Sequence, residues 1–177
     1  MNYTEFAEKI KGIPSSYEAY KARGLDDVFI RKQIQEYQIM RKKDAVIMDN
    51  DDEIIKLINV FDLTGLSIGM VNFLYQPLVA QEEVVFFGKF ETDDLVLYNP
   101  NGEIRCYEEQ SEHLMYKCAK NGSMFLDALF EAGCFLEKCG LDDDLYNNEQ
   151  IAQEMAEYCS ELAGGKQYKD FYSVMFS

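Results

Sequence analysis

One histidine and two cysteines are the residues of this chain that could carry out nucleophilic chemistry. His113 would serve as the base and the thiol of Cys106 or Cys118 as the nucleophile, because a thiol is activated by a neighbouring base or by a lowered pKa. His113 stands in a polar stretch where no nearby residue is placed as its catalytic partner, and Cys106 alternates within an expected strand. We therefore predict an ordinary surface histidine and keep a small Cys–His hydrolase as an alternative.

Metal and phosphate sites have spacings that this sequence lacks. Zinc usually takes four Cys or His ligands in short paired spacings, whereas Cys134 and Cys139 lie five residues apart on an expected helix. The acidic run 49–53 is not a calcium loop, because Ile54 and Val60 stand where that loop needs Gly and Glu. No glycine-rich phosphate loop is present. We predict no cofactor, no metal site and no enzymatic activity.

The charge of the chain is strongly acidic and unevenly placed. The net charge is −15, with nine Lys/Arg and six Asp/Glu in residues 1–43 against eight and 26 in residues 44–177. An acidic body repels nucleic-acid phosphates and anionic lipid, and it attracts basic proteins. The charge therefore predicts a basic protein partner, with no nucleic acid and no membrane, although acidity can also serve solubility alone.

Cysteine usage and hydropathy predict a cytoplasmic protein. The five cysteines are an odd number without a CxxC pair, which favours reduced thiols over a disulfide framework. Polar residues and a proline interrupt the most apolar stretch, residues 66–80, so it is not expected to span a bilayer. The first residues show no basic region followed by an apolar run, so no signal peptide is expected.

A strand–turn–strand pattern is the best local signal of structure. Strands are predicted at 84–90, 95–98 and 104–107 from their β-branched and aromatic residues. Pro100 presets φ for a turn, and Gly102 can take the left-handed conformation that closes it. This stretch predicts an antiparallel hairpin.

Helical spacing of apolar residues surrounds this hairpin on both sides. A short strand or extended piece is expected at 45–48, and a further strand at 66–75, where Gly69 marks a bulge or a close approach. The predicted class is α+β, a mainly antiparallel sheet with helices packed around it, in a single domain of residues 1–177. Helices are predicted at 3–11, after Pro14, at 26–43, at 54–61 up to a stop at Thr64-Gly65, at 124–136, at 151–162 and at 168–175.

Four segments resemble the SUKH superfamily, the Smi–Knr group. Residues 13–24 resemble its aliphatic–Pro–x–x–Tyr segment before a short helix that ends in Gly. Residues 87–104 are similar to its glycine-containing strand and Asn-Gly-x-Ile hairpin, and residues 121–129 to its helix of the pattern x-Phe-Leu-x-x-Leu. The ending 164–172 is similar as well. We interpret residues 26–43 as a helical insertion in this SUKH-like domain.

The resemblance implies a non-enzymatic α+β protein without shared catalytic residues. Bacterial members are commonly immunity proteins that bind and neutralise a partner toxin, and others are regulators or adaptors. The leading hypothesis is therefore an immunity protein that binds a basic toxin domain, and the alternative is an intracellular adaptor or scaffold of the same fold. The acidic pairs that flank the hairpin are our predicted partner contacts: Asp93, Asp94, Glu108 and Glu109.

Overall fold

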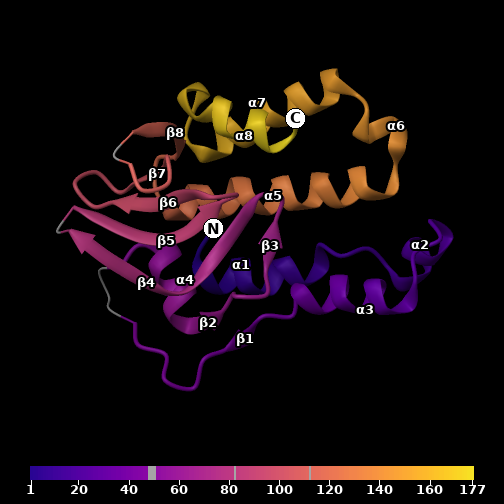
Figure 1. Ribbon diagram of the computed structural model, residues 1–177, viewed down its shortest axis with the longest axis horizontal. Coiled ribbons are helices and arrows are strands. Elements are labelled where there is room, and N and C mark those ends of the chain that lie inside the picture. The colour runs from indigo at the N-terminus through magenta and orange to yellow at the C-terminus, as the bar shows by residue number, and fades with distance from the viewer. Residues whose placement is uncertain (48–50, 82, 112) are drawn as a thin grey trace.

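A six-stranded antiparallel sheet lies at the centre of the fold (Figure 1). The computed structural model describes residues 1–47, 51–81, 83–111 and 113–177. The strands are β1 (Met40–Arg41), β2 (Phe61–Asp62), β3 (Ser67–Ile68), β4 (Val71–Gln81), β5 (Val84–Phe90), β6 (Asp93–Tyr98), β7 (Glu103–Tyr107) and β8 (Leu114–Ala119). The large sheet has the order β3-β4-β5-β6-β7-β8, so each strand lies beside its neighbour in sequence, and β1 pairs with β2 in a small second sheet.

Helices pack around the sheet, which confirms the predicted α+β class. Seven of the described helices begin with a residue whose side chain accepts a main-chain N–H of the first turn: Asn2, Ser16, Asp26, Asp52, Asn121, Asp142 and Asn148. Within the described ranges, no helix combines the length and the apolar character needed to cross a bilayer. The helices are α1 (Tyr3–Lys9), the 3-10 helix η1 (Ile10–Gly12), α2 (Tyr17–Ala22), α3 (Asp27–Glu36), α4 (Glu53–Val60), α5 (Gly122–Leu141), α6 (Asp143–Tyr146), α7 (Glu149–Ala163), the 3-10 helix η2 (Lys166–Tyr168) and α8 (Lys169–Met175).

The β6–β7 hairpin forms as the sequence predicts. Gly102 has φ of +74°, and its N–H donates to the carbonyl of Tyr98 over 2.9 Å. A left-handed residue at this place is typical of hairpin loops that contain a turn and a bulge. The predicted strand 84–90 also matches the bounds of β5.

The predicted strand 66–75 is wrong, because the chain reverses within it. Gly69 has φ of +56° and joins β3 to β4 in a tight hairpin. A Cβ at this position would lie 2.8 Å from Cδ1 of Leu136 on α5, so Gly69 does mark a close approach, but in a turn and not in a bulge. A further strand, β8, follows the polar loop after β7, and no strand was predicted there from the sequence.

The helix expected over 26–43 ends at Glu36, and Met40 and Arg41 form β1 instead. Pairing of Met40 with Asp62 and of Arg41 with Phe61 outweighs the weak helical preference of this stretch. The same pairing makes α4 end at Val60, before the predicted stop at 64–65. Residues 45–47 form no strand, and Met48 of the predicted segment lies outside the described residues.

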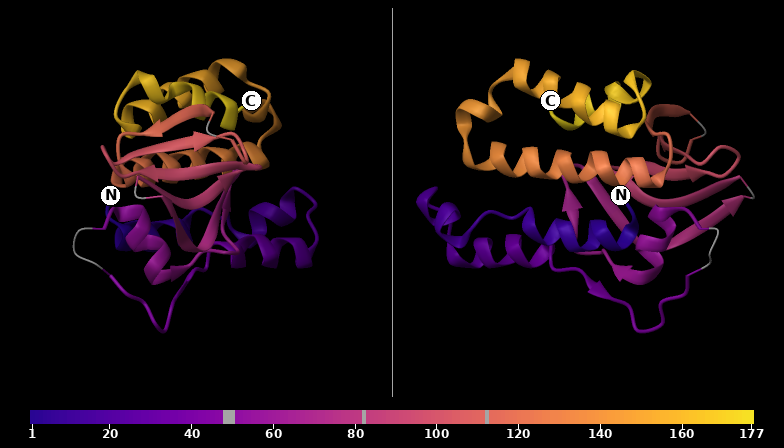
Figure 2. Two further views of the ribbon diagram at one scale, coloured as in Figure 1. Left: turned by 60° about the vertical axis from the view of Figure 1, so that its left-hand side comes forward. Right: turned by 180° about the vertical axis from the view of Figure 1, so that it is seen from behind.

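One face of the sheet carries the hydrophobic core. Phe87 of β5 and Phe171 of α8 contact Phe125 of α5, with ring centroids 5.9 and 6.2 Å away. Leu95 and Ile104 of the neighbouring strands point into the same cluster and are fully buried. In Figure 1, strands β4, β5 and β6 lie in front of α4 and α5, and the rear view in Figure 2 shows these helices on the near side.

A half-buried carboxylate joins the starts of two helices beside this core. Oδ1 of Asp52 accepts the N–H of Ile54 over 2.9 Å and caps α4, and Oδ2 accepts the N–H of Gly122, the first residue of α5. Burial raises the pKa of the Asp52 carboxyl. A side chain at Gly122 would collide with this carboxylate, so glycine is required where the two helices meet.

The β4 edge is only partly covered by β3. Among the described residues, β3 pairs with residues 71 and 72 of β4, and further along β4 pairs with β5 alone. Pro77 lies in this stretch and has no N–H to offer. Beside it, the ammonium of Lys42 donates to the main-chain carbonyl of Tyr75. Tyr75 and Pro77 both lie in the irregular part of β4 between Phe73 and Leu78, where the pairing with β5 also shifts register.

Candidate protein-binding surface

The structure brings the four predicted contact residues to one end of the sheet. Asp93 and Asp94 begin β6, and Glu108 and Glu109 follow the end of β7, which runs antiparallel to β6. The main-chain N–H of Glu109 donates to Oδ1 of Asp93 over 3.2 Å. We call these four residues the acidic sheet end.

A lysine lies inside this acidic group. Nζ of Lys89 on β5 is 2.9 Å from Oδ1 of Asp94 and 3.4 Å from Oε1 of Glu109, and it donates to the carbonyl of Thr92 over 2.9 Å. Burial lowers the pKa of Lys89, but its pairing with Asp94 and Glu109 outweighs burial and raises it. Lys89 therefore stays charged and holds two of the carboxylates in place.

The four carboxylates differ in their exposure to solvent and therefore to a partner. Asp93 and Asp94 are half-buried, whereas Glu108 and Glu109 are exposed. The N–H of Glu108 donates to the carbonyl of His113 over 3.0 Å, so the loop between β7 and β8 is closed at its base. Glu108 and Glu109 are thus the charges that a partner can reach. Asp93 accepts the main-chain N–H of Glu109 and so helps to hold it in place.

The face of the sheet opposite the core continues from the acidic sheet end. Strand pairing places Lys89, Asp94 and Tyr107 in one row across β5, β6 and β7, and Phe86, Val96, Arg105 and Lys117 in the next. The apolar members of these rows take no part in the core cluster. We call this surface the open sheet face, because the core helices α4 and α5 lie on the other side of the sheet (Figure 1). At the β7–β8 side of this face, the hydroxyl of Tyr168 on η2 donates to Oε1 of Glu103 over 3.4 Å.

Arg105 is the centre of a connected polar network on the open sheet face. Its guanidinium lies 3.8 Å from the ring centre of Tyr98, its Nη1 is 3.2 Å from the hydroxyl of Tyr107, and its Nε donates to Glu103 over 2.7 Å. Nζ of Lys117 is 3.2 Å from the other oxygen of Glu103. Burial raises the pKa of Glu103, but these two cations outweigh burial and lower it.

This network was not among the predicted sites, although the sequence contains a signal for it. Glu103, Arg105 and Tyr107 alternate with buried Ile104 and Cys106. A period of two places alternate residues of a strand on opposite faces of the sheet. The alternation could have identified a polar second face, but not which residues of β6 and β8 complete it.

The cysteines and the histidine of the hydrolase alternative differ in their exposure to solvent. Cys106 and Cys118 are fully buried and His113 is exposed. Burial raises the pKa of the Cys106 thiol to about 12 and that of Cys118 well above its ordinary value. A buried, protonated thiol is a poor nucleophile. Among the described residues, no three His, Cys, Asp or Glu side chains gather as a metal site would require.

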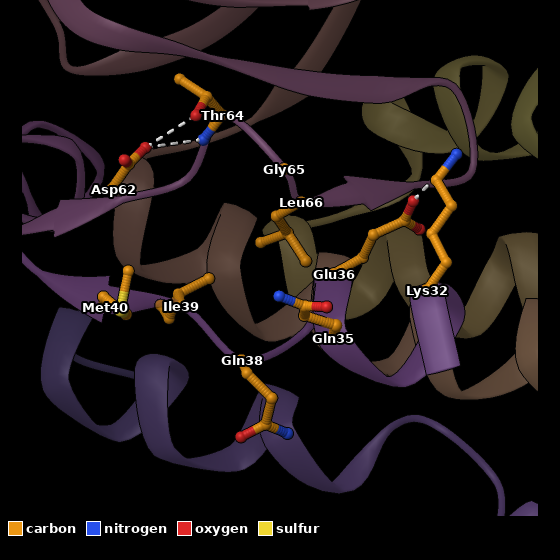
Figure 3. A pocket seen from close by; sticks show the side chains of 10 residues that line it. All are labelled: Lys32, Gln35, Glu36, Gln38, Ile39, Met40, Asp62, Thr64, Gly65 and Leu66. Carbon is orange, nitrogen blue, oxygen red and sulfur yellow. Dashed lines mark hydrogen bonds and ion pairs between the residues drawn. The ribbon is translucent and has the colours of Figure 1, made fainter. Parts of the chain in front are cut away.

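A hollow of about 360 Å³ lies between the end of α3, β1 and the connection from β2 to β3 (Figure 3). Its charged groups are already paired within the chain. Asp62 accepts hydrogen bonds from the N–H and hydroxyl of Thr64 over 3.1 and 2.8 Å, and Lys32 lies 3.7 Å from Glu36. These pairs do not place a nucleophile beside a base in the hollow. The lining residues are Lys32, Gln35, Glu36, Gln38, Ile39, Met40, Asp62, Thr64, Gly65 and Leu66.

Comparison of the chain with protein-family models, with curated proteins and with solved structures finds no match.

Proposed function

We propose that this protein is a non-enzymatic, cytoplasmic binding protein, and specifically an immunity protein that neutralises a bacterial toxin by direct contact. The observation that carries the proposal is the gathering of Asp93, Asp94, Glu108 and Glu109 at one end of the sheet. The contacts of Lys89 with Asp94 and Glu109 fix the positions of these two carboxylates before any partner arrives. The partner would be a basic toxin domain.

The charge of the acidic sheet end favours recognition of a basic surface. Lys89 balances one of the four carboxylates and leaves a net charge of −3 in this group. The chain as a whole carries −15. Such a field steers a cationic domain toward the surface and raises the association rate more than the affinity.

Beside the charges of the acidic sheet end, a stable interface needs side chains that contribute binding energy, and the open sheet face supplies them. Tyr98 and Arg105 are of the residue types that dominate binding energy at interfaces, and their stacking limits the entropy they lose on binding. A partner whose basic groups meet Glu108 and Glu109 would extend over this face. The resemblance of the sequence to the SUKH superfamily supports the same kind of role.

Affinity capture with charge-reversed variants tests the proposal. Wild-type protein, Glu108→Lys/Glu109→Lys and the control Glu154→Lys/Glu161→Lys on exposed positions of α7 are immobilised and exposed to extract of the source cell. We expect a basic protein to bind the wild type and the control and to be lost from the first variant. Binding that survives the first variant, or that only the control loses, would reject the acidic sheet end as the contact.

Growth of cells that express the captured partner separates the two kinds of binding protein. An immunity protein is expected to restore growth that the partner alone arrests, and Glu108→Lys/Glu109→Lys should restore it less. An adaptor or scaffold of the same fold would bind a partner that is harmless when expressed alone.

A further inference from the structure

Three large apolar side chains remain in water around one hollow beside β1. The exposed fractions are 72% for Met40, 64% for Val46 and 58% for Tyr75. Single exposed apolar residues are ordinary, whereas several around a concave surface mark an interaction site. The hollow measures about 630 Å³, and we call it the β1 groove after these lining residues: Met40, Arg41, Lys42, Lys43, Val46 and Tyr75.

The β1 groove carries positive charge on a strongly acidic protein. Arg41 and Lys43 are exposed, and neither takes part in any ion pair among the residues that the structure describes. Asp44 and Asp62 also line the hollow, so the three cations and two carboxylates of its lining give a net charge of +1. Two cations are therefore available to a ligand beside the three apolar side chains.

One wall of the β1 groove is held in a fixed position. Nζ of Lys42 lies 4.1 Å from the ring centre of Tyr75 and donates to the carbonyl of Ile58 over 2.7 Å and to that of Tyr75. A cation above a ring and bonded to two carbonyls limits the freedom of both side chains. Lys42 is thus a positioning residue, and Tyr75 is ready to pack against a ligand without further ordering.

We propose that the β1 groove is a docking site for a short acidic peptide segment with apolar side chains, carried by a protein partner. Carboxylates of the peptide meet Arg41 and Lys43, and its apolar side chains pack on Met40, Val46 and Tyr75. This surface shares no residue with the acidic sheet end, so the two sites can be tested separately.

The size of the ligand follows from the charge of the rest of the chain. Electrostatic interactions are screened within about 8 Å at physiological salt, so a short peptide experiences the local cations of the β1 groove. A long RNA or an anionic bilayer would also meet the remaining surface, where residues 44–177 carry 26 acidic and only eight basic side chains. Repulsion from that surface disfavours both extended polyanions.

Selection from a random dodecapeptide library, displayed on phage, tests the proposal. The library is selected on the wild-type protein and counter-selected on Met40→Asp/Arg41→Ala/Lys43→Ala. We expect the recovered sequences to combine Asp or Glu with Leu, Ile or Phe. Synthetic copies of them should lose about ten-fold or more in affinity, measured by fluorescence anisotropy, when Arg41 and Lys43 are both replaced by Ala.

The control removes the same charge elsewhere. Lys120→Ala/Lys166→Ala replaces two exposed lysines outside the β1 groove, and it should change the affinity by less than about two-fold. The proposal is overturned if no acidic–apolar sequences are enriched, or if both double variants weaken binding equally. Tighter binding of a uridine 20-mer, or of vesicles containing phosphatidylserine, than of the recovered peptides would overturn it as well.

Discussion

The carboxylate of Asp52 accepts a hydrogen bond from the main-chain N–H of Gly122 over 3.1 Å, across a sequence separation of 70 residues. Its other oxygen caps α4 through the N–H of Ile54. One side chain therefore satisfies donors at the starts of two helices that pack on the same face of the sheet, and it fixes where α5 begins relative to α4.

Replacement of Gly122 by Ala should destabilise the protein, because the new Cβ would collide with the Asp52 carboxylate. We expect the free energy of unfolding, measured in urea, to fall by about 2 kcal/mol. Gly140→Ala is the matched control in the same helix, since a Cβ there meets no atom within 4 Å. It should raise the free energy of unfolding by about 0.5 kcal/mol. Equal losses in both variants would contradict this role of Gly122.

The ion pairs of Glu103 should make stability depend on pH. Burial raises the pKa of Glu103, but Arg105 and Lys117 outweigh burial, so the pKa lies below its ordinary 4.5. A carboxylate with a lowered native pKa contributes stability above its unfolded value, and the contribution is lost as pH falls through the native value. We expect Glu103→Gln to lower the free energy of unfolding by about 2 kcal/mol near neutral pH.

Urea unfolding at several pH values checks this dependence. The difference between wild type and Glu103→Gln should shrink as the pH is lowered from 4.5. Glu154→Gln, at an exposed position of α7, should stay within about 0.5 kcal/mol of the wild type near neutral pH. A Glu103→Gln difference that stayed constant over the acidic range would show that the network does not depend on the carboxylate charge.

Replacement of Lys89 by Gln should affect stability and partner association in opposite directions. The variant loses the contacts of Lys89 with Asp94 and Glu109, and we expect the free energy of unfolding to fall by about 1 kcal/mol. The acidic sheet end gains one negative charge, so the association rate with the captured basic partner should rise at low salt. Stopped-flow measurements at two salt concentrations check this, and a slower rate would contradict the proposed contact.

The five thiols should differ in their rate of alkylation. Cys134 is half-buried, whereas Cys106 and Cys118 are fully buried. Burial raises the pKa of all three thiols, to about 12 for Cys106. We expect iodoacetamide at neutral pH to modify Cys134 first, as followed by mass spectrometry of peptides, and to modify Cys106 and Cys118 only after unfolding. Rapid labelling of either buried thiol in the native protein would revive the hydrolase alternative.

Local sequence signals predicted much of the fold. The β6–β7 hairpin depends on Gly102 within its own turn, and the caps at Ser16 and Asp26 act on adjacent residues. Pairing between distant segments was not predictable in this way. Arg41 leaves a helical pattern because it pairs with Phe61, twenty residues further along, and nothing near Arg41 reveals that partner.

The candidate surface was predictable in part for the same reason. Asp94 and Glu109 flank an antiparallel hairpin, and hairpin geometry brings its two open ends together. The role of Lys89 between them depends on the register of β5 against β6. The stacking of Arg105 on Tyr98 likewise requires the register of β6 against β7, which composition and periodicity leave open.

The partly covered edge of β4 bears on how this protein behaves at high concentration. A long strand with unpaired amides can recruit the same strand of another molecule and begin fibril growth. Pro77 removes one donor from that edge, and Lys42 occupies the acceptor of Tyr75. We expect both residues to hinder cross-β assembly, so replacement of either one should reduce the colloidal stability of the protein before its folding stability.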